Sequence, residues 1–202
     1  MKITLGLIVE GHGDVQAAPV LVRRIIQEID PQIHLRIPLP IRIPKNRMVR
    51  PGELERAVDF AARQLSDRGG VLVLLDADED CPALLGPDLL ERAKGSRPDK
   101  PVGLVIAKTE FESWFLAAAE SLRGQRGLAQ DLTSPPDPEG IRGAKEWLTR
   151  QMTTGRKYRE TVDQIALARR LDLAAAARAS SFRKLRRDVR HLVHRICGSE
   201  LQ

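Results

Sequence analysis

Short apolar runs alternate with helical periodicity along the first 122 residues of the chain. Three nearly uninterrupted runs of Val, Ile and Leu are typical of strands buried on both faces of a parallel sheet. These runs lie at residues 3–9, 71–75 and 102–107. Apolar residues spaced three and four apart predict helices at residues 15–29, 51–65, 83–93 and 109–122. This alternation predicts an α/β fold with a doubly wound, mostly parallel sheet and right-handed crossovers.

A fourth strand is predicted at residues 33–43, where apolar and polar positions alternate with period two. Pro38 and Pro40 lie within this stretch and cannot donate ladder hydrogen bonds, so we expect an edge strand or a partly irregular one. Residues 45–50 follow as a basic loop.

The pattern changes after residue 124. Residues 124–143 hold four glycines and three prolines and predict a long loop. Helical periodicity then returns at residues 144–152, 158–171 and 181–196, without further strands. We therefore predict an α/β domain at residues 1–124 and a helical extension at residues 125–202 that packs on it and ends in a basic amphipathic helix.

Composition narrows the class of protein. The apolar share of 42% is enough for a real core, and aromatic residues make up only 3%, which argues against recognition by stacking on bases. The chain has only two cysteines, Cys81 and Cys197, and we see neither a signal peptide nor an apolar run of spanning length. We expect a cytoplasmic protein that does not contact a membrane.

Basic residues gather in two zones, and residues 178–195 alone carry +6, which equals the net charge of the chain. Residues 31–52 contain five basic residues and no acid, and residues 178–195 contain seven basic residues and one acid. Such zones favour a polyanionic partner, although solvated charged faces are an equally simple interpretation of either zone alone. The candidate nucleic-acid-binding residues are Arg36, Arg42, Lys45, Arg47, Arg50, Arg183, Lys184, Arg186, Arg187 and Arg190.

Acidic residues follow two of the predicted strands. Glu10 ends the first apolar run, and Asp76, Asp78 and Asp80 follow the run at 71–75. If the two strands are neighbours, these carboxylates meet at one sheet edge, and an extended chain would point Asp76 and Asp78 to the same side. Carboxylate oxygens suit Mg²⁺ or Mn²⁺, so the pattern predicts a metal site for phosphoryl transfer or hydrolysis. The simpler alternative is a solvated acidic loop with Glu10 near a helix N-terminus.

Two other phosphate-binding motifs fail. Gly11 and Gly13 begin like a dinucleotide fingerprint, but Gln16 occupies the third glycine position, and no Lys-Ser/Thr pair follows as a P-loop requires. These glycines instead suggest a tight turn.

An apolar strand ending in Val-Glu-Gly, followed by a later strand ending in Asp-x-Asp, resembles the TOPRIM domain of topoisomerases, primases and nucleases. The resemblance implies that Glu10 is the catalytic glutamate and that Asp76 and Asp78 bind metal, with Asp80 as a further ligand. Gly11 matches the glycine after the glutamate.

A resemblance that covers most of the chain is to the TOPRIM-like family called domain of unknown function 4276. The similar stretches include VEGHGD, LLDADEDCP, TEFESWFLA, Gly-Ala-Lys145 and the segment from Tyr158 to Gln164. In this family a Glu-x-Trp portion, here Glu112-Ser-Trp114, is a recognisable feature, which points to Glu112 as a further metal ligand. Glu110 at the same strand end and the nearby Lys108 are candidate accessory residues by their position. The resemblance also implies an ATPase partner and a role in phage defence. Acids at a helix start have dipole and capping explanations as well.

Three hypotheses follow for the function. The first is a Mg²⁺-dependent phosphodiester hydrolase, most simply a nuclease, in which Lys157, Tyr158 and Arg159 reach substrate if the helical part folds over the site. The second is a non-catalytic regulatory module that binds nucleic acid or an ATPase. The third, a phospho-acceptor fold with an Asp nucleophile, is the weakest because the first strand ends in Glu10.

Overall fold

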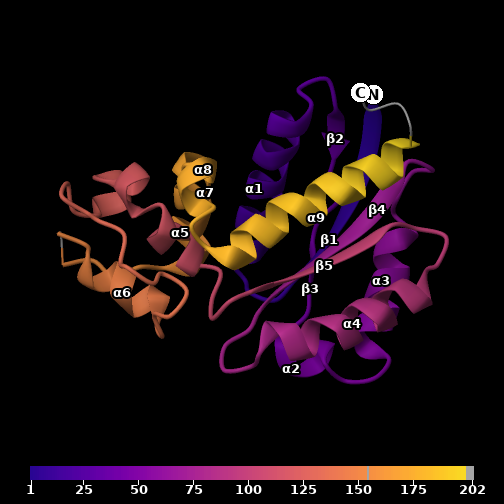
Figure 1. The fold of residues 1–202 in the computed structure, drawn as a ribbon, viewed down its shortest axis with the longest axis horizontal. Coiled ribbons are helices and arrows are strands. Elements are labelled where there is room, and N and C mark those ends of the chain that lie inside the picture. Colours follow the sequence, from indigo (N-terminus) through magenta and orange to yellow (C-terminus); the bar gives the residue numbers. More distant parts are fainter. Residues whose placement is uncertain (154, 199–202) are drawn as a thin grey trace.

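A five-stranded parallel sheet forms the centre of the protein (Figure 1). The computed structural model describes residues 1–153 and 155–198. The strand order is β2-β1-β4-β5, and β3 also pairs with β1. The strands are β1 (Lys2–Val9), β2 (His34–Arg36), β3 (Ile41–Arg42), β4 (Gly69–Asp76) and β5 (Val102–Ala107). The predicted α/β class with a mostly parallel sheet is therefore confirmed.

Helices cover both faces of the sheet, as the apolar runs require. On one face lie α1 (Asp14–Ile29) and α9 (Ser180–Cys197), and on the other lie α3 (Glu53–Ala62) and α4 (Pro82–Ser96). Side chains that alternate along β1 and β4 divide between two apolar clusters, one under each pair of helices. The result is a three-layer α/β/α arrangement.

The last helix lies directly on the sheet. Glycines at positions 70 and 103 leave room for it: an added Cβ would lie 2.9 Å from Ile196 Cδ1 at Gly70 and 2.9 Å from Leu192 Cδ1 at Gly103. The start of α9 is fixed by Glu139, whose carboxylate accepts hydrogen bonds from the backbone amides of Ser180 (2.7 Å) and Ser181 (2.9 Å). The end of the chain thus supplies part of one helical layer.

A helical lobe joins β5 to α9 and lies beside the carboxyl ends of the strands (Figure 1). Its helix α7 packs against α1, and its apolar residues belong to the same buried cluster as the α1 face of the sheet. The lobe consists of α5 (Ser113–Ala117), η1 (Ala119–Leu122), η2 (Gln125–Gly127), α6 (Ala144–Arg150), η3 (Glu160–Gln164), α7 (Ile165–Arg170) and α8 (Leu173–Ala176).

The prediction of a partly irregular edge strand at residues 33–43 is confirmed: the stretch forms two short strands, β2 and β3, because the intervening segment carries Pro38 and Pro40. Two other local predictions need correction. The predicted basic loop at 45–50 begins as a helix, α2 (Lys45–Met48), which follows Pro44. The helix predicted at 109–122 starts only at Ser113, because Thr109 has a positive φ of 67°.

The predicted helix at 158–171 is also irregular at its start. Residues Glu160–Gln164 form a π-helical turn before α7 begins. Such turns are frequent at functional sites, and this one brings Gln164 against the start of α1, as described below.

Candidate functional site

The carboxyl ends of β1 and β4 lie side by side. The strands pair in parallel, with Val9 opposite Leu74, so the prediction that they are neighbours is confirmed. One residue beyond β1, Glu10 Oε2 accepts a hydrogen bond of 3.0 Å from the backbone amide of Asp76. Glu10 and Asp76 therefore lie at the same edge of the sheet.

Asp76 turns its carboxylate towards the start of the helical lobe. Its Oδ1 accepts a hydrogen bond of 2.9 Å from the backbone amide of Phe111. Burial raises the pKa of Asp76 well above its usual range, and the nearby carboxylates of Asp14, Glu112 and Glu10 raise it further. Burial also raises the pKa of Glu10, although the amide of Asp76 opposes this shift. Carboxyl groups are thus crowded together at this edge of the sheet, and their raised pKa values favour the protonated form.

Asp78 lies in a turn rather than on an extended strand. The backbone leaves the strand in a turn in which Asp78 has a positive φ of 49°. The amide of Asp78 donates to Thr109 O at 2.8 Å, which holds this turn against the segment after β5. The expectation that both residues lie on one extended strand is therefore wrong, because the strand ends at Asp76.

Lys45 occupies the space between the outer acids. Its Nζ lies 3.1 Å from Asp78 Oδ2 and 2.8 Å from Asp80 Oδ2. Burial alone would lower the pKa of Lys45, but the hydrogen bonds to Asp80 and Asp78 raise it. Lys45, predicted as a contact for nucleic acid, thus acts here as the counter-ion of two predicted metal ligands.

Glu112 is the most deeply buried acid of the site, with 0% of its surface exposed. Its Oε1 accepts a hydrogen bond of 3.0 Å from the Tyr158 hydroxyl. Its Oε2 is buried and has no hydrogen-bond partner among the described residues. Burial raises the pKa of Glu112 to about 8, with Lys145 opposing and Asp14 reinforcing the shift. An unpartnered buried carboxylate oxygen is costly and marks this position for a proton or a cation.

Asp14 is a member of the site that the sequence analysis missed. Its Oδ2 accepts from the amide of Gly11 at 2.8 Å, and its Oδ1 accepts from Gln164 Nε2 at 2.8 Å. Burial raises the pKa of Asp14. Gly13 has ordinary helical dihedral angles, so the backbone conformation does not require a glycine there. The glycine instead leaves room for the Gln164 side chain, because an added Cβ would lie 1.8 Å from Gln164 Oε1. The sequence signal that could have identified Asp14 is its position directly after the turn at Gly11 and Gly13, at the same strand end as Glu10.

Lys145 brings one positive charge to this cluster. Its Nζ lies 2.6 Å from Glu160 Oε2. Burial lowers its pKa, but the charges of Glu112, Glu160 and Asp76 outweigh burial and raise it. Lys145 and Tyr158 both come from the helical lobe, so the lobe closes over the acidic edge of the sheet.

The remaining predicted accessory residues lie around this cluster. Glu110 Oε1 accepts a hydrogen bond of 3.1 Å from the amide of Ala144, at the start of α6, so it has a structural contact. Lys108 is exposed just beyond β5.

Across the described ranges 1–153 and 155–198, no three His, Cys, Asp or Glu side chains converge in a geometry that could hold a metal ion.

The first basic zone is divided by the fold. Arg42 donates to Glu10 O at 3.4 Å and, with Lys45, borders the acidic site. Arg36 lies on β2 and donates to Gln64 O at 3.3 Å, while Arg47 pairs with Glu53 at 2.8 Å. Arg50 is exposed after α2. Only part of this zone can therefore meet a ligand at the site.

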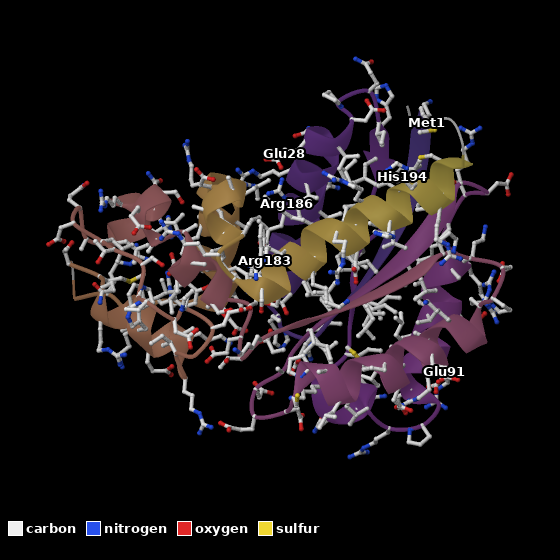
Figure 2. The ribbon with its side chains drawn as sticks, in the orientation of Figure 1. Met1, Glu28, Glu91, Arg183, Arg186 and His194 are labelled. Carbon is white, nitrogen blue, oxygen red and sulfur yellow. The ribbon has the colours of Figure 1, made fainter. Side chains whose placement is uncertain are left out.

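The second basic zone lies on the outer surface of α9. Figure 2 shows Arg186 beside Glu28 of α1, and their side chains are 2.8 Å apart. Lys184 donates to Leu104 O at 2.7 Å and also contacts Asp188. The other members of the zone are Arg183, which donates to backbone carbonyls, Arg187, which is 3.5 Å from Asp188, and the exposed Arg190. These arginines thus form a surface of the α1–α9 layer.

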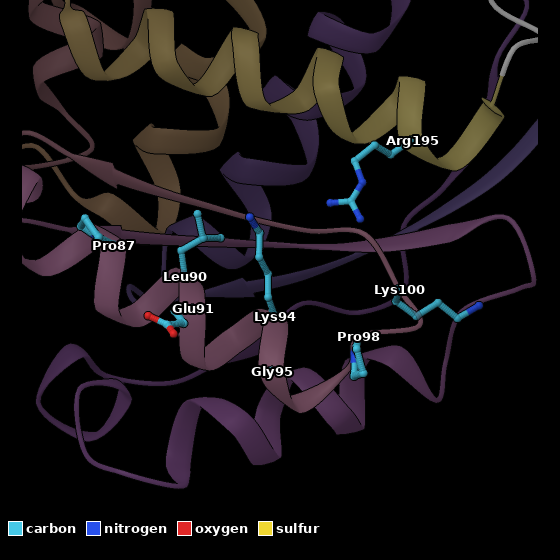
Figure 3. Close-up of a pocket in the computed structure, with 8 residues that line it drawn as sticks. All are labelled: Pro87, Leu90, Glu91, Lys94, Gly95, Pro98, Lys100 and Arg195. Carbon is cyan, nitrogen blue, oxygen red and sulfur yellow. The ribbon is translucent and has the colours of Figure 1, made fainter.

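A large pocket also lies away from the acids. It has a volume of about 710 Å³ and is lined by residues of α4, the following turn and Arg195 of α9 (Figure 3). Pro98 and Lys100 in its wall precede β5, so the pocket lies at the amino end of that strand. The acidic site is at the carboxyl ends.

Within the described part of the chain, no helix has the length and apolar character needed to cross a membrane.

Comparison with known proteins places the chain in a family without giving it an activity. No curated protein and no solved structure matches it. The profile of a family described as a domain of unknown function, DUF4276, matches residues 9–190, which include every acid of the site. The chain therefore belongs to the DUF4276 family.

Proposed function

We propose that the protein is a Mg²⁺- or Mn²⁺-dependent phosphodiester hydrolase, most simply a nuclease, with a TOPRIM-like α/β core. The observation that carries the proposal is the hydrogen bond of 3.0 Å between Glu10 Oε2 and the amide of Asp76 at the joined ends of β1 and β4. In parallel α/β sheets this edge is where ligands bind.

The donor set suits a hard divalent cation. Glu10 and Asp76 offer carboxylate oxygens at the sheet edge, and Glu112 Oε2 is a buried oxygen without a partner among the described residues. Mg²⁺ usually binds through one or two carboxylates, keeps several waters and shares substrate phosphate, so a cage of three protein ligands is not required. Asp78 would join Glu10 and Asp76 if it exchanged its contact with Lys45 for the cation. When bound, the metal would polarise the phosphate and lower the pKa of a coordinated water.

The chain's own residues have complementary tasks in this proposal. Glu10, with its pKa raised by burial, is suited to accept a proton from the attacking water. Arg42 and Lys45 border the acids and can contact substrate phosphate, which offsets the repulsion between substrate and carboxylates.

The proposal is tested by incubating plasmid DNA, single-stranded DNA and RNA with the protein and Mg²⁺ or Mn²⁺. We expect cleavage that EDTA abolishes and that falls by at least about 100-fold in Asp76→Asn and Glu10→Gln proteins. Glu91→Gln, which removes an exposed charge on α4, is the matched control and should cleave normally. Equal cleavage by all four proteins would refute the proposal.

A second candidate function is a regulatory module that binds nucleic acid or an ATPase partner without cleaving anything. The observation in its favour is that Lys45 neutralises Asp78 and Asp80, as a structural counter-ion would. This candidate predicts no divalent cation bound per chain and full biological function in the Asp76→Asn protein. An ATPase partner and a role in phage defence rest on the family resemblance and belong to either candidate.

A further inference from the structure

A basic pocket lies on the helical lobe, next to the acidic site. Its volume is about 710 Å³, and it opens between α6 and the segment that leads into η3. Its wall carries two acids, Glu146 and Glu160, and twice as many basic residues. The basic residues are Lys145, Arg150, Lys157 and Arg159.

Three of these cations are available to a ligand. Lys145 is paired with Glu160 at 2.6 Å. Arg150, Lys157 and Arg159 are exposed, and their side chains form no ion pair with any residue that the structure describes. On α9, by comparison, Arg186 and Lys184 pair with acids. Among the described residues, this pocket therefore brings three cations without an acid partner together on the lobe that covers the acidic site.

The pocket and the acidic site share a wall. Tyr158 lines the pocket, and its hydroxyl donates to Glu112 Oε1 at 3.0 Å. Lys145 lines the pocket as well, and its charge interacts with those of Glu112 and Asp76. A chain lying in the pocket would consequently contact two residues that also interact with the acids of the site.

We propose that this pocket holds the sugar–phosphate backbone of a single nucleic-acid strand, beside the phosphate that reaches Glu10 and Asp76. The inference deepens the proposed function and takes the class of its ligand from it. Arginine binds phosphate through a fork of parallel hydrogen bonds, and two arginines and one lysine can contact successive phosphates. The volume admits a single strand, whereas a duplex would lie across its mouth.

Recognition in this pocket is independent of base sequence. Tyr158 is 8% exposed and hydrogen-bonded, so its ring offers little surface for a base to stack on. Contacts to phosphate give affinity that falls steeply with salt concentration. The pocket thus explains how a chain with few aromatic residues could hold a single strand.

The test measures binding without cleavage, by fluorescence anisotropy of labelled single-stranded DNA and RNA 12-mers in EDTA over a range of salt concentrations. The test variant is the triple substitution Arg150→Ala, Lys157→Ala and Arg159→Ala. The control removes three exposed cations elsewhere: Lys2→Ala, Arg23→Ala and Lys94→Ala. Both variants lower the net charge equally, and a thermal melt checks that both remain folded.

We expect the test variant to reduce the slope of log K against log salt concentration by about 2, since each phosphate contact with a single strand contributes about 0.7. The control variant should keep the wild-type slope. An unchanged slope in the test variant, or an equal reduction in both variants, would overturn the inference. Tighter binding of a duplex of the same length, or equal binding of polyglutamate, would also overturn it.

The two proposals fail separately. If the wild-type protein binds the strand through these residues but never cleaves it, the pocket inference holds and the hydrolase is refuted. If it cleaves nucleic acid and the slope does not change in the test variant, the hydrolase holds and this pocket is not where the strand lies.

Discussion

The Glu112→Gln substitution tests whether a buried, protonated carboxyl group lies at the centre of the site. Glu112 is 0% exposed and has one unpartnered oxygen among the described residues. Its pKa rises from the ordinary value of 4.5 to about 8, chiefly because of burial. Glutamine has almost the same shape, can still accept the hydrogen bond from Tyr158 and does not ionise at neutral pH.

The sign of the pH effect follows from the raised pKa. Between pH 4.5 and about 8 the folded protein keeps a proton that the unfolded chain releases. The stability that Glu112 contributes is therefore fully present below pH 4.5 and is lost as the pH rises to about 8. Each pH unit in this window costs ~1.4 kcal/mol, which sets a ceiling of ~5 kcal/mol. The charges of Asp14, Asp76 and Lys145 face the same group and spread its titration.

The assay is urea unfolding of wild-type and Glu112→Gln proteins at several pH values, in EDTA so that no cation binds the acids. From pH 5.5 to 7.5 we expect the stability of the variant relative to wild type to rise by about 2–3 kcal/mol. Glu91→Gln should follow the wild-type profile. If the Glu112→Gln and wild-type profiles are parallel, Glu112 is ionised in the folded protein and this account of the site is wrong.

Three further substitutions test other parts of the structure. Glu139→Ala removes the carboxylate that caps α9, and we expect it to lower the free energy of unfolding by about 2–3 kcal/mol in urea titrations. A change below about 0.5 kcal/mol would contradict the capping role. Gly103→Ala places a Cβ 2.9 Å from Leu192, so it should cost about 1–3 kcal/mol in the same assay, and a neutral effect would mean that α9 packs less closely. Lys45→Met frees Asp78 from its counter-ion, so we expect calorimetry to show an Mn²⁺ affinity about fivefold higher. Weaker Mn²⁺ binding would show that Asp78 is not a ligand.

The apolar runs were sufficient to predict the central layer of the fold. Buried parallel strands must be apolar on both faces, so β1, β4 and β5 are visible as runs of Val, Ile and Leu. Their carboxyl ends carry the acids, and Glu10 and Asp76 do meet there. That part of the site depends only on strand ends and strand order.

The rest of the site depends on tertiary contacts that periodicity does not reveal. Asp78 leaves the strand direction because its amide bonds to Thr109, which follows a different strand. Asp14 appears in the sequence as an ordinary acid at a helix start, but Gln164, 150 residues later, buries it. Glu112 owes its raised pKa to the helical lobe that closes over it.

Charge counts were the least informative signal. A run of arginines reports how many cations are present, and partners elsewhere in the chain decide how many are free. Arg186 of α9 is paired with Glu28, 158 positions away. Arg150 lies in a segment that did not stand out by composition, and Arg159 was singled out by its place in the helical part rather than by charge, yet both line the pocket next to the acids.

The central claim is that the carboxylates at the joined ends of β1 and β4 bind a divalent cation. Titration of the metal-free protein with Mn²⁺, followed by electron paramagnetic resonance of the free ion, tests this claim most directly. We expect saturable binding in the wild-type and Glu91→Gln proteins, and binding weakened at least tenfold in Asp76→Asn, because Asp76 supplies a carboxylate at the strand end. Identical titration curves for wild-type and Asp76→Asn proteins would contradict the account.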